Sequence, residues 1–378
     1  MLLDQENIDP NRPDKYGDVP LGCAAFYGHE RVVRLLLEWE NIDPIRPDED
    51  GDGPLGCAAI RRHEGVVKFL LKRENVDPNH RNMNDRTPLV CAAMKGHQGV
   101  VKLLLEQENV DPNCPDKGGA GPLVWAALKG HEGVVKVLLE RESVDPNRPD
   151  AHGSGPLAWA ALKGHEGVVK LLLEQEHVDP DGPDKYDRTP LGSAAFEGHE
   201  GVVKLLLGQD NVDSNHPDED GDGPLGCAAF YGHEGVVKLL LGQGNVDPNH
   251  QNKNDRTPLL CAAINGNERV VKLLLEQENV DPNRPDKHDL TPLGGAACWG
   301  HAGVVKLLLE REDVNPDPPD KNGRTPLGLA AIKGHNGVVK LLLERENVDP
   351  NRPDKYNRTP LWWATIKGHE RVAQLLRG

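Results

Sequence analysis

The sequence predicts an all-α protein built as a solenoid, in which many small helix pairs stack in series. A Pro-Leu dipeptide recurs every 34 residues in eleven copies, without an insertion or a deletion between them. Aromatic residues make up only 4 % of the 378-residue chain, although apolar residues reach 37 %. Such a chain has too few large side chains to fill one deep core, whereas it can fill many thin ones. The prolines of the repeated dipeptide are Pro20, Pro54, Pro88, Pro122, Pro156, Pro190, Pro224, Pro258, Pro292, Pro326 and Pro360.

The first helix of each unit is predicted by its end signals. In the unit that runs from Pro183 to His216, Thr189 offers an N-cap oxygen. Pro190 then occupies the first helical position, where a missing N–H does no harm. Small and apolar residues follow, and Gly198 permits a sharp turn. We therefore expect a short helix in each unit, closed by a glycine turn.

The second helix carries a Val-Val-Lys-Leu-Leu-Leu run, which in this unit is residues 202–207. Its apolar residues surround most of the helix, so the helix must be covered on more than one side. The segment NVDSNHPDED that follows holds Pro, Asp and Asn in turn-forming positions. A helix pair this small cannot bury its own faces, and we expect neighbouring units to stack on it.

Taken together, these motifs resemble those of the ankyrin-repeat family along essentially the whole chain. The matching residues are Thr-Pro-Leu-x-x-Ala-Ala, then Gly-His, then Val-Val-Lys-Leu-Leu-Leu, and finally Val-Asp-Pro-Asn. The resemblance implies two antiparallel helices and a short β-hairpin or loop tip per repeat, stacked into a curved solenoid. It also implies a scaffold that binds proteins through its tips and the concave face of its inner helices. The repeat pattern, close to GHEGVVKLLLEQENVDPNRPD, further resembles arrays of fungal cytosolic receptor-like proteins that combine a NACHT domain with ankyrin repeats.

We interpret residues 1–378 as one array that begins with a partial repeat at 1–13. The last repeat, 354–378, is truncated within or just after its second helix, and neither end shows a polar capping repeat. We therefore expect a segment of a longer protein. The repeats between these ends are 14–47, 48–81, 82–115, 116–149, 150–183, 184–217, 218–251, 252–285, 286–319 and 320–353.

Three departures from the family pattern carry structural expectations. Gly replaces the capping Thr in several repeats, which should lower stability by roughly a few tenths of a kcal/mol each. Arg62 occupies the turn position that Gly holds elsewhere, so we expect local strain in the second repeat. Asn267 replaces the histidine that follows this turn in the other repeats.

The charge balance excludes several classes of function. The chain holds 44 Lys and Arg against 60 Asp and Glu, a net charge of −16, which argues against a general nucleic-acid or anionic-membrane surface. No apolar run approaches the ~20 residues that span a bilayer, and the N-terminus lacks the features of a secretion signal. We expect a monomeric cytoplasmic protein.

Five of the seven cysteines share one place in the repeat and are interpreted as reduced packing residues: Cys23, Cys57, Cys91, Cys227 and Cys261.

Two patterns imitate metal sites. A histidine follows the turn glycine in most repeats, but stacked helices lie roughly 8–10 Å apart, farther than two ligands of one metal. We interpret these histidines as a structural ladder. The acidic loops 48–53 and 218–223 resemble the start of an EF-hand, but their twelfth position is Ala59 or Ala229 instead of Glu. We expect solvated acidic turns, with weak calcium binding as the alternative, and no metal or other cofactor.

The sequence predicts no catalytic activity. The shared cysteine position is filled by Trp or Leu in other repeats, which a nucleophile would not tolerate. Cys114, in an Asn-Cys-Pro loop, is expected to be the most exposed thiol, with oxidation as its chemistry. No Ser, His and Asp set stands apart, because nearly every candidate recurs with the period.

Two positions at the end of the first helix indicate the binding surface. At about 100° per residue, Leu191, Ala194 and Ala195 centre on one face, and Phe196 lies roughly opposite, toward the groove. We name this position the apolar row; it forms either an exposed stripe or a wedge between repeats. Its members are Phe26, Ile60, Met94, Leu128, Leu162, Phe196, Phe230, Ile264, Cys298, Ile332 and Ile366.

The next position, which we name the groove row, varies far more. Its aromatic residues are of the kind enriched in protein-binding hot spots. Its six basic residues would suit an acidic partner, although a plain solvated row is the alternative. The groove row consists of Tyr27, Arg61, Lys95, Lys129, Lys163, Glu197, Tyr231, Asn265, Trp299, Lys333 and Lys367.

We predict a non-catalytic module that recognises a protein or peptide on its concave face, as the sensing or scaffolding segment of a larger protein. A structural spacer or elastic tether without a specific ligand is the alternative, and the regulatory part of an enzyme is a remote one. The tips add further candidates for contact, so that the predicted binding residues are Tyr16, Phe26, Tyr27, Arg61, Met83, Lys95, Lys129, Lys163, Tyr186, Phe230, Tyr231, His288, Trp299, Lys333, Tyr356 and Lys367.

Overall fold

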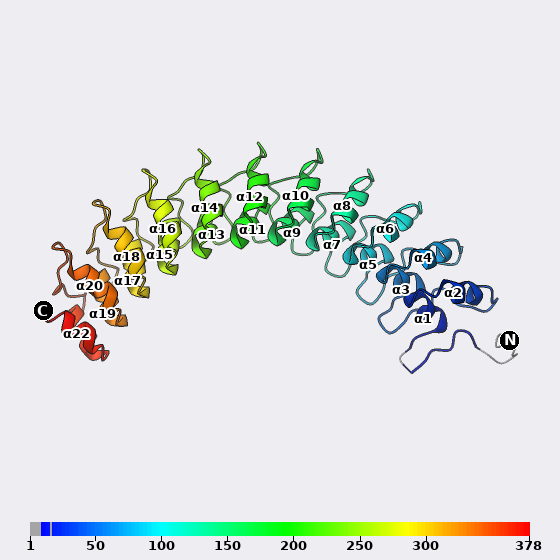
Figure 1. Ribbon diagram of the computed structural model, residues 1–378, viewed down its shortest axis with the longest axis horizontal. Coiled ribbons are helices and arrows are strands. Elements are labelled where there is room, and N and C mark those ends of the chain that lie inside the picture. Colours follow the sequence, from blue (N-terminus) through cyan, green and yellow to red (C-terminus); the bar gives the residue numbers. More distant parts are fainter. Residues whose placement is uncertain (1–8, 16) are drawn as a thin grey trace. The chain divides into compact units, whose positions relative to one another are not determined.

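The computed structural model describes residues 9–15 and 17–378, which fold into helices connected by turns, with no strand among them. Tyr16 and most of the expected partial repeat therefore lie outside the described residues. The chain divides into two compact units, residues 1–185 and 186–378. Each unit is a series of helix pairs, so the predicted all-α stack of helix-turn-helix repeats is confirmed (Figure 1).

The first unit contains five helix pairs. They are α1 (Pro20–Phe26) with α2 (Glu30–Leu37), α3 (Pro54–Ile60) with α4 (Glu64–Leu70), α5 (Pro88–Lys95) with α6 (Gln98–Leu105), α7 (Pro122–Leu128) with α8 (Glu132–Leu139), and α9 (Pro156–Lys163) with α10 (Glu166–Leu173).

The second unit contains six helix pairs. They are α11 (Pro190–Glu197) with α12 (Glu200–Leu207), α13 (Pro224–Tyr231) with α14 (Glu234–Leu241), α15 (Pro258–Asn265) with α16 (Glu268–Leu275), α17 (Pro292–Trp299) with α18 (Ala302–Leu309), α19 (Pro326–Lys333) with α20 (Asn336–Leu343), and α21 (Pro360–Ile366) with α22 (Glu370–Leu375).

Each unit consists of two layers of helices. Within the first unit, the first helices α1, α3, α5, α7 and α9 contact one another in order, and the second helices α2 to α10 form a parallel series behind them. The second unit repeats this arrangement, from α11 to α21 and from α12 to α22 (Figure 1). The core of each layer is supplied by small and branched residues, such as Ala194, Ala195, Val202 and Leu206, all fully buried.

The helix ends follow the predicted chemistry. The Thr189 hydroxyl accepts a hydrogen bond from the backbone N–H of Gly192 at 3.1 Å, with Pro190 at the first helical position. Gly198 then ends α11 in the left-handed conformation, at a φ of 81°. Where Gly53 takes the place of the threonine, α3 begins in the same backbone conformation without a side-chain cap. The proline at the first helical position is thus the start signal that α3 and α11 share, and the threonine cap adds to it where it is present.

Histidine side chains join consecutive repeats, as the predicted ladder requires. His131 Nε2–H donates to the carbonyl oxygen of Met94, the last half-buried residue of the preceding first helix, at 3.1 Å. The His131 backbone N–H also donates to Ala126 O at 2.9 Å, so one residue binds both repeats. Asn267 performs the same task with Nδ2, which lies 2.9 Å from the Phe230 oxygen. The histidine rungs are His63, His97, His131 and His165 in the first unit and His233, His301, His335 and His369 in the second.

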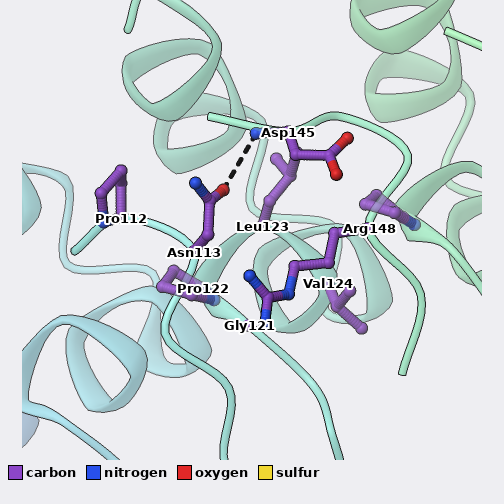
Figure 2. Close-up of a pocket in the computed structure, with 9 residues that line it drawn as sticks. Pro112, Asn113, Gly121, Pro122, Leu123, Val124, Asp145 and Arg148 are labelled. Atoms are coloured by element: carbon purple, nitrogen blue, oxygen red, sulfur yellow. Dashed lines mark hydrogen bonds between the residues drawn. The ribbon is translucent and has the colours of Figure 1, made fainter. Parts of the chain in front are cut away.

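Asparagine side chains form a second ladder along the loops. Asn113 Nδ2 donates to Ser143 O at 2.6 Å, and Asn113 Oδ1 accepts from the backbone N–H of Asp145 at 2.9 Å. Figure 2 shows this second bond beside a hollow of only about 10 Å³, next to Arg148. Asn249 makes the equivalent pair of bonds to residues 279 and 281 in the second unit. The asparagine of Val-Asp-Pro-Asn thus aligns one loop with the next.

The tips are tight turns joined by single backbone hydrogen bonds. Lys117 N–H donates to Asn84 O at 3.0 Å, and Ala151 N–H donates to Gly118 O at 2.9 Å. Inside the fourth repeat's tip, Asp116 Oδ1 accepts from the backbone N–H groups of Gly118 and Ala120. An aspartate or asparagine at this place orders the tip by satisfying the turn's own donors.

Arg62 carries the strain that the sequence indicates. Its φ is 65°, in the left-handed region that its neighbours fill with glycine, such as Gly96 at 77°. A non-glycine residue in this conformation is destabilised by roughly 1 kcal/mol or more. The hydrogen bond from the His97 ring to the carbonyl oxygen of Ile60 is nevertheless kept, at 2.9 Å.

Replacing the rung histidine should destabilise the array in a graded way. We expect His131→Ala to lower the free energy of unfolding by about 1–2 kcal/mol, because the Met94 carbonyl loses its donor. His131→Asn should lower the free energy of unfolding less, since Asn267 already donates a hydrogen bond from the same position of its own repeat. Urea denaturation followed by circular dichroism measures both, and equal losses for Ala and Asn would contradict the ladder.

Relieving the turn at residue 62 should have the opposite sign. We expect Arg62→Gly to raise the free energy of unfolding by roughly 1 kcal/mol, because glycine adopts a positive φ freely. Arg62→Ala is the matched control, since it removes the charge and keeps the Cβ atom. If Arg62→Ala raised the free energy of unfolding as much as Arg62→Gly does, the destabilising feature of Arg62 would be its charge and not its backbone conformation. Thermal unfolding of both variants beside the parent decides between them.

Candidate functional site

The groove row lies at the end of each first helix, and its side chains are exposed in both units. Tyr27 is 65 % exposed, Tyr231 48 % and Trp299 62 %. Large aromatic side chains at such exposure are available for contact. The structure therefore places the predicted row at the surface, while its role in binding stays a prediction.

The apolar row is neither a fully exposed stripe nor a fully buried wedge. Most of its side chains are half-buried, and Phe230 and Ile366 are exposed. At two places a groove residue contacts the apolar residue of the repeat before it. The Arg61 guanidinium lies 4.0 Å from the Phe26 ring centroid. The Tyr231 and Phe196 rings are 4.5 Å apart, edge to face. The two rows therefore touch across consecutive repeats at these places.

The two units present different chemistry on this surface. In the first unit the groove row is Tyr27 followed by four cations, Arg61, Lys95, Lys129 and Lys163. In the second unit the groove row is mixed: it begins with Glu197, Tyr231, Asn265 and Trp299. Tyr231 is in edge-to-face contact with Phe230 of the apolar row, at 4.9 Å. Lys333 and Lys367, both exposed, complete the second unit's row.

The tip residues predicted to contact a partner are also at the surface. Met83 is 62 % exposed, Tyr356 68 % and Tyr186 37 %, and His288 is exposed as well. Their backbones are fixed by the bonds between tips: His288 O, for example, accepts from Lys321 N–H at 2.9 Å.

Sequence reasoning missed a set of tryptophan–aspartate hydrogen bonds. Trp125 Nε1–H donates to Asp116 Oδ2 at 3.0 Å, and Trp159 Nε1–H donates to Asp150 Oδ2 at 2.9 Å. The sequence predicts only packing for this position, which cysteine fills in other repeats, whereas these tryptophan rings are half-buried and border the groove. The signal was present, because each tryptophan follows the tip aspartate by nine residues. Trp363 and Asp354 repeat the bond at 3.1 Å.

Two carboxylates of the acidic loop 48–53, those of Asp48 and Asp52, are engaged within the fold. Asp48 Oδ1 accepts from the backbone N–H groups of Asp50 and Asp52, at 3.0 and 2.8 Å. Asp52 is 8 % exposed and accepts from Asn82 Nδ2 at 3.0 Å. Among residues 9–15 and 17–378, no group of three His, Cys, Asp or Glu is placed to hold a metal ion. These contacts favour an ordered turn over a calcium loop.

The cysteines at the shared position are packing residues, as predicted, but the prediction for Cys114 is wrong. Burial raises the pKa of the Cys91 thiol to about 12, which makes it a poor nucleophile. Cys114 is only 6 % exposed, because its loop packs against the preceding repeat. Arg81 Nη2 lies 2.8 Å from its sulfur. The side chain that we expected to be oxidised is therefore covered.

Comparisons with known proteins agree with the fold. A family model described as "Ankyrin repeats (3 copies)" matches residues 1–82, 74–150, 142–218, 225–320 and 312–378. A second, described as "Ankyrin repeats (many copies)", matches residues 197–241. No curated protein matches the chain. In the part of the chain that the structure describes, no helix has the length and apolarity that crossing a membrane requires.

The buried carboxyl of Asp52 should make stability depend on pH. Burial raises its pKa to about 6, and the nearby Asp48 and Asp50 act in the same direction. The folded state therefore binds this proton more tightly than the unfolded chain, so stability falls as pH rises from about 4 to about 6. We expect Asp52→Asn to stabilise the protein by about 1–2 kcal/mol at pH 7.5 and by almost nothing at pH 4.

The control for this experiment is Asp50→Asn, which alters an exposed carboxylate of the same loop. It should give a much smaller gain at pH 7.5. Denaturation midpoints for the parent and both variants, measured from pH 4 to pH 7.5, test the expectation. A gain for Asp52→Asn that is the same at every pH would contradict it.

Proposed function

This chain belongs to the ankyrin-repeat family, whose members are generally protein–protein interaction modules, and on this premise we propose that it recognises a protein or peptide along the groove row and the tips. We propose a non-catalytic role, as the sensing or scaffolding segment of a larger cytoplasmic protein. The repeats delimited above would act as one monomeric array. The regulatory part of an enzyme is the remote alternative.

The observation that carries the proposal is the contrast between a fixed backbone and a varied surface. Ladders of His and Asn side chains hold consecutive repeats at one spacing in each unit. On that frame the groove row changes from four consecutive cations in the first unit to a mixture that includes Tyr231 and Trp299 in the second, and its side chains remain exposed. Exposed aromatic and basic residues on a rigid frame are the composition of protein-binding hot spots.

A spacer without a specific ligand is the second candidate. The regularity of the ladders favours it, since a tether needs uniform contacts between repeats and no particular surface. The two candidates differ in what happens when only groove side chains are changed. A spacer is unaffected, whereas a binding module loses its partner.

The test is crosslinking capture from a lysate of the source cells with the full chain as bait. The groove variant carries Tyr27→Ala, Tyr231→Ala and Trp299→Ala. The matched control carries Lys204→Ala, Lys272→Ala and Lys306→Ala, three exposed positions on the second helices α12, α16 and α18. Circular dichroism confirms that both variants keep the helix content of the parent.

We expect at least one protein that the parent and the control variant capture and that the groove variant loses. Equal capture by all three baits would move recognition away from the groove row and toward the tips. Capture of nothing above bare matrix by any bait would favour the spacer.

A further inference from the structure

The first unit contains a hollow that its neighbouring repeats shape together. It has a volume of about 370 Å³ and lies between the tips of the third, fourth and fifth repeats and the first helices α7 and α9. Its apolar wall is formed by Val124, Trp125, Leu128 and Trp159. This volume is near the lower end of the ~300–1,000 Å³ typical of ligand pockets, which suits one or two inserted side chains.

Both tryptophans are held in place by bonds to their indole N–H groups, and their rings stay half-buried. Trp125 and Trp159 each donate the indole N–H to a tip aspartate, at 3.0 and 2.9 Å. The indole has no other donor and no acceptor, so what it still offers is its apolar ring. Because the rings are already fixed, a ligand that packs on them does not have to order them first.

The carboxylates that line the hollow are occupied by the protein itself. Asp116 Oδ2 accepts from Trp125 and from Arg86 Nε at 3.2 Å, and its Oδ1 accepts from the turn. Asp150 Oδ1 accepts from the backbone N–H groups of His152 and Ser154. The acidic groups of the hollow are therefore engaged on both of their oxygens.

Cations surround the hollow. The Arg86 guanidinium, paired with Asp116, lies 4.8 Å from the Trp125 ring centroid, and Lys129 Nζ lies 6.0 Å from it. Lys117 lines the hollow and is exposed, and Lys163 is exposed one helical turn after Trp159. These four cations outnumber the two carboxylates that line the hollow, Asp116 and Asp150, although the whole chain is acidic.

We propose that this hollow binds an extended acidic peptide segment of a partner protein. One apolar or aromatic side chain of the segment enters between Trp125 and Trp159, and its carboxylates pair with Lys95, Lys129 and Lys163. Equivalent residues in stacked repeats lie roughly 8–10 Å apart, and three residues of a polyproline II segment span about 9 Å with their side chains on the same face. The segment therefore carries acidic residues three positions apart. The inference deepens the function proposed above and rests on it.

The experiment is a selection of phage-displayed random dodecapeptides on the full chain, with a parallel selection on a double variant, Trp125→Leu with Trp159→Leu. Leucine is a safe replacement, because Leu329 occupies the same place in the repeat and is buried there. The enriched peptide, labelled with fluorescein, is then titrated by anisotropy. A variant with Lys95→Gln, Lys129→Gln and Lys163→Gln is titrated beside it. Lys333→Gln, in the same row of the second unit, is the control.

We expect enriched peptides with Asp or Glu three residues apart around one apolar residue. The leucine variant and the triple glutamine variant should each bind at least about tenfold more weakly, in line with the loss of a hot spot, and Lys333→Gln should bind like the parent. Higher salt should weaken binding to the parent, because the lysines are exposed.

Four results would overturn the proposal: no enrichment, enriched peptides without acidic residues, equal binding by the leucine variant, or displacement of the peptide by a dodecamer of deoxythymidine. The last would assign the hollow to single-stranded nucleic acid, which also uses stacked aromatics and cations. If any of these results appears while the groove variant still loses its captured protein, only the peptide proposal fails. If the captured protein is retained as well, recognition along the groove row fails with it.

Discussion

The hydrogen bond from a turn histidine to the preceding repeat is the interaction on which the surface of this protein depends. Its acceptor is the carbonyl oxygen of the apolar row, one residue before the groove row. By fixing Met94 O, the His131 ring also fixes the backbone that presents Lys95. The bond in turn dictates the turn residue, because a Cβ atom on Gly96 would lie 2.7 Å from the ring of His131. Glycine is therefore the favoured partner of the histidine, although Arg62 precedes His97 at the cost of a positive φ and Asn267 replaces the histidine after Gly232. The recurrence of this bond holds consecutive first helices together within each unit.

The residues that hold the repeats together are not the residues of the groove row, so the surface can vary without disturbing the fold. The His and Asn ladders and the bonds between tips run through backbone atoms and a few fixed side chains. The groove residue that follows each carbonyl takes no part in them. Tyr231, Asn265 and Trp299 succeed one another in adjacent repeats at the ends of α13, α15 and α17. A change of binding chemistry is thus local, as expected for a solenoid whose contacts are between nearest neighbours.

The sequence was sufficient for the parts of the structure that local rules decide. The cap at Thr189, the turn at Gly198 and the strain at Arg62 are set by the residue and its immediate neighbours, and each was predicted. The histidine ladder followed from the period and from the distance between stacked helices. Predictions failed where a side chain is defined by another repeat. Cys114 is covered by Arg81 from the repeat before it, and no local pattern announces such a contact.

The tryptophan–aspartate bonds show how the same limit affects the candidate site. The carboxylates of Asp116 and Asp150 keep their negative charge, but indole and backbone donors hold both of them in place. The Arg86 guanidinium pairs with Asp116 and offsets its charge locally. Nearby cations such as Lys117 and Lys163 are exposed. An acidic protein can thus present a group of cations to a partner, because the placement of charged side chains matters as well as the net charge.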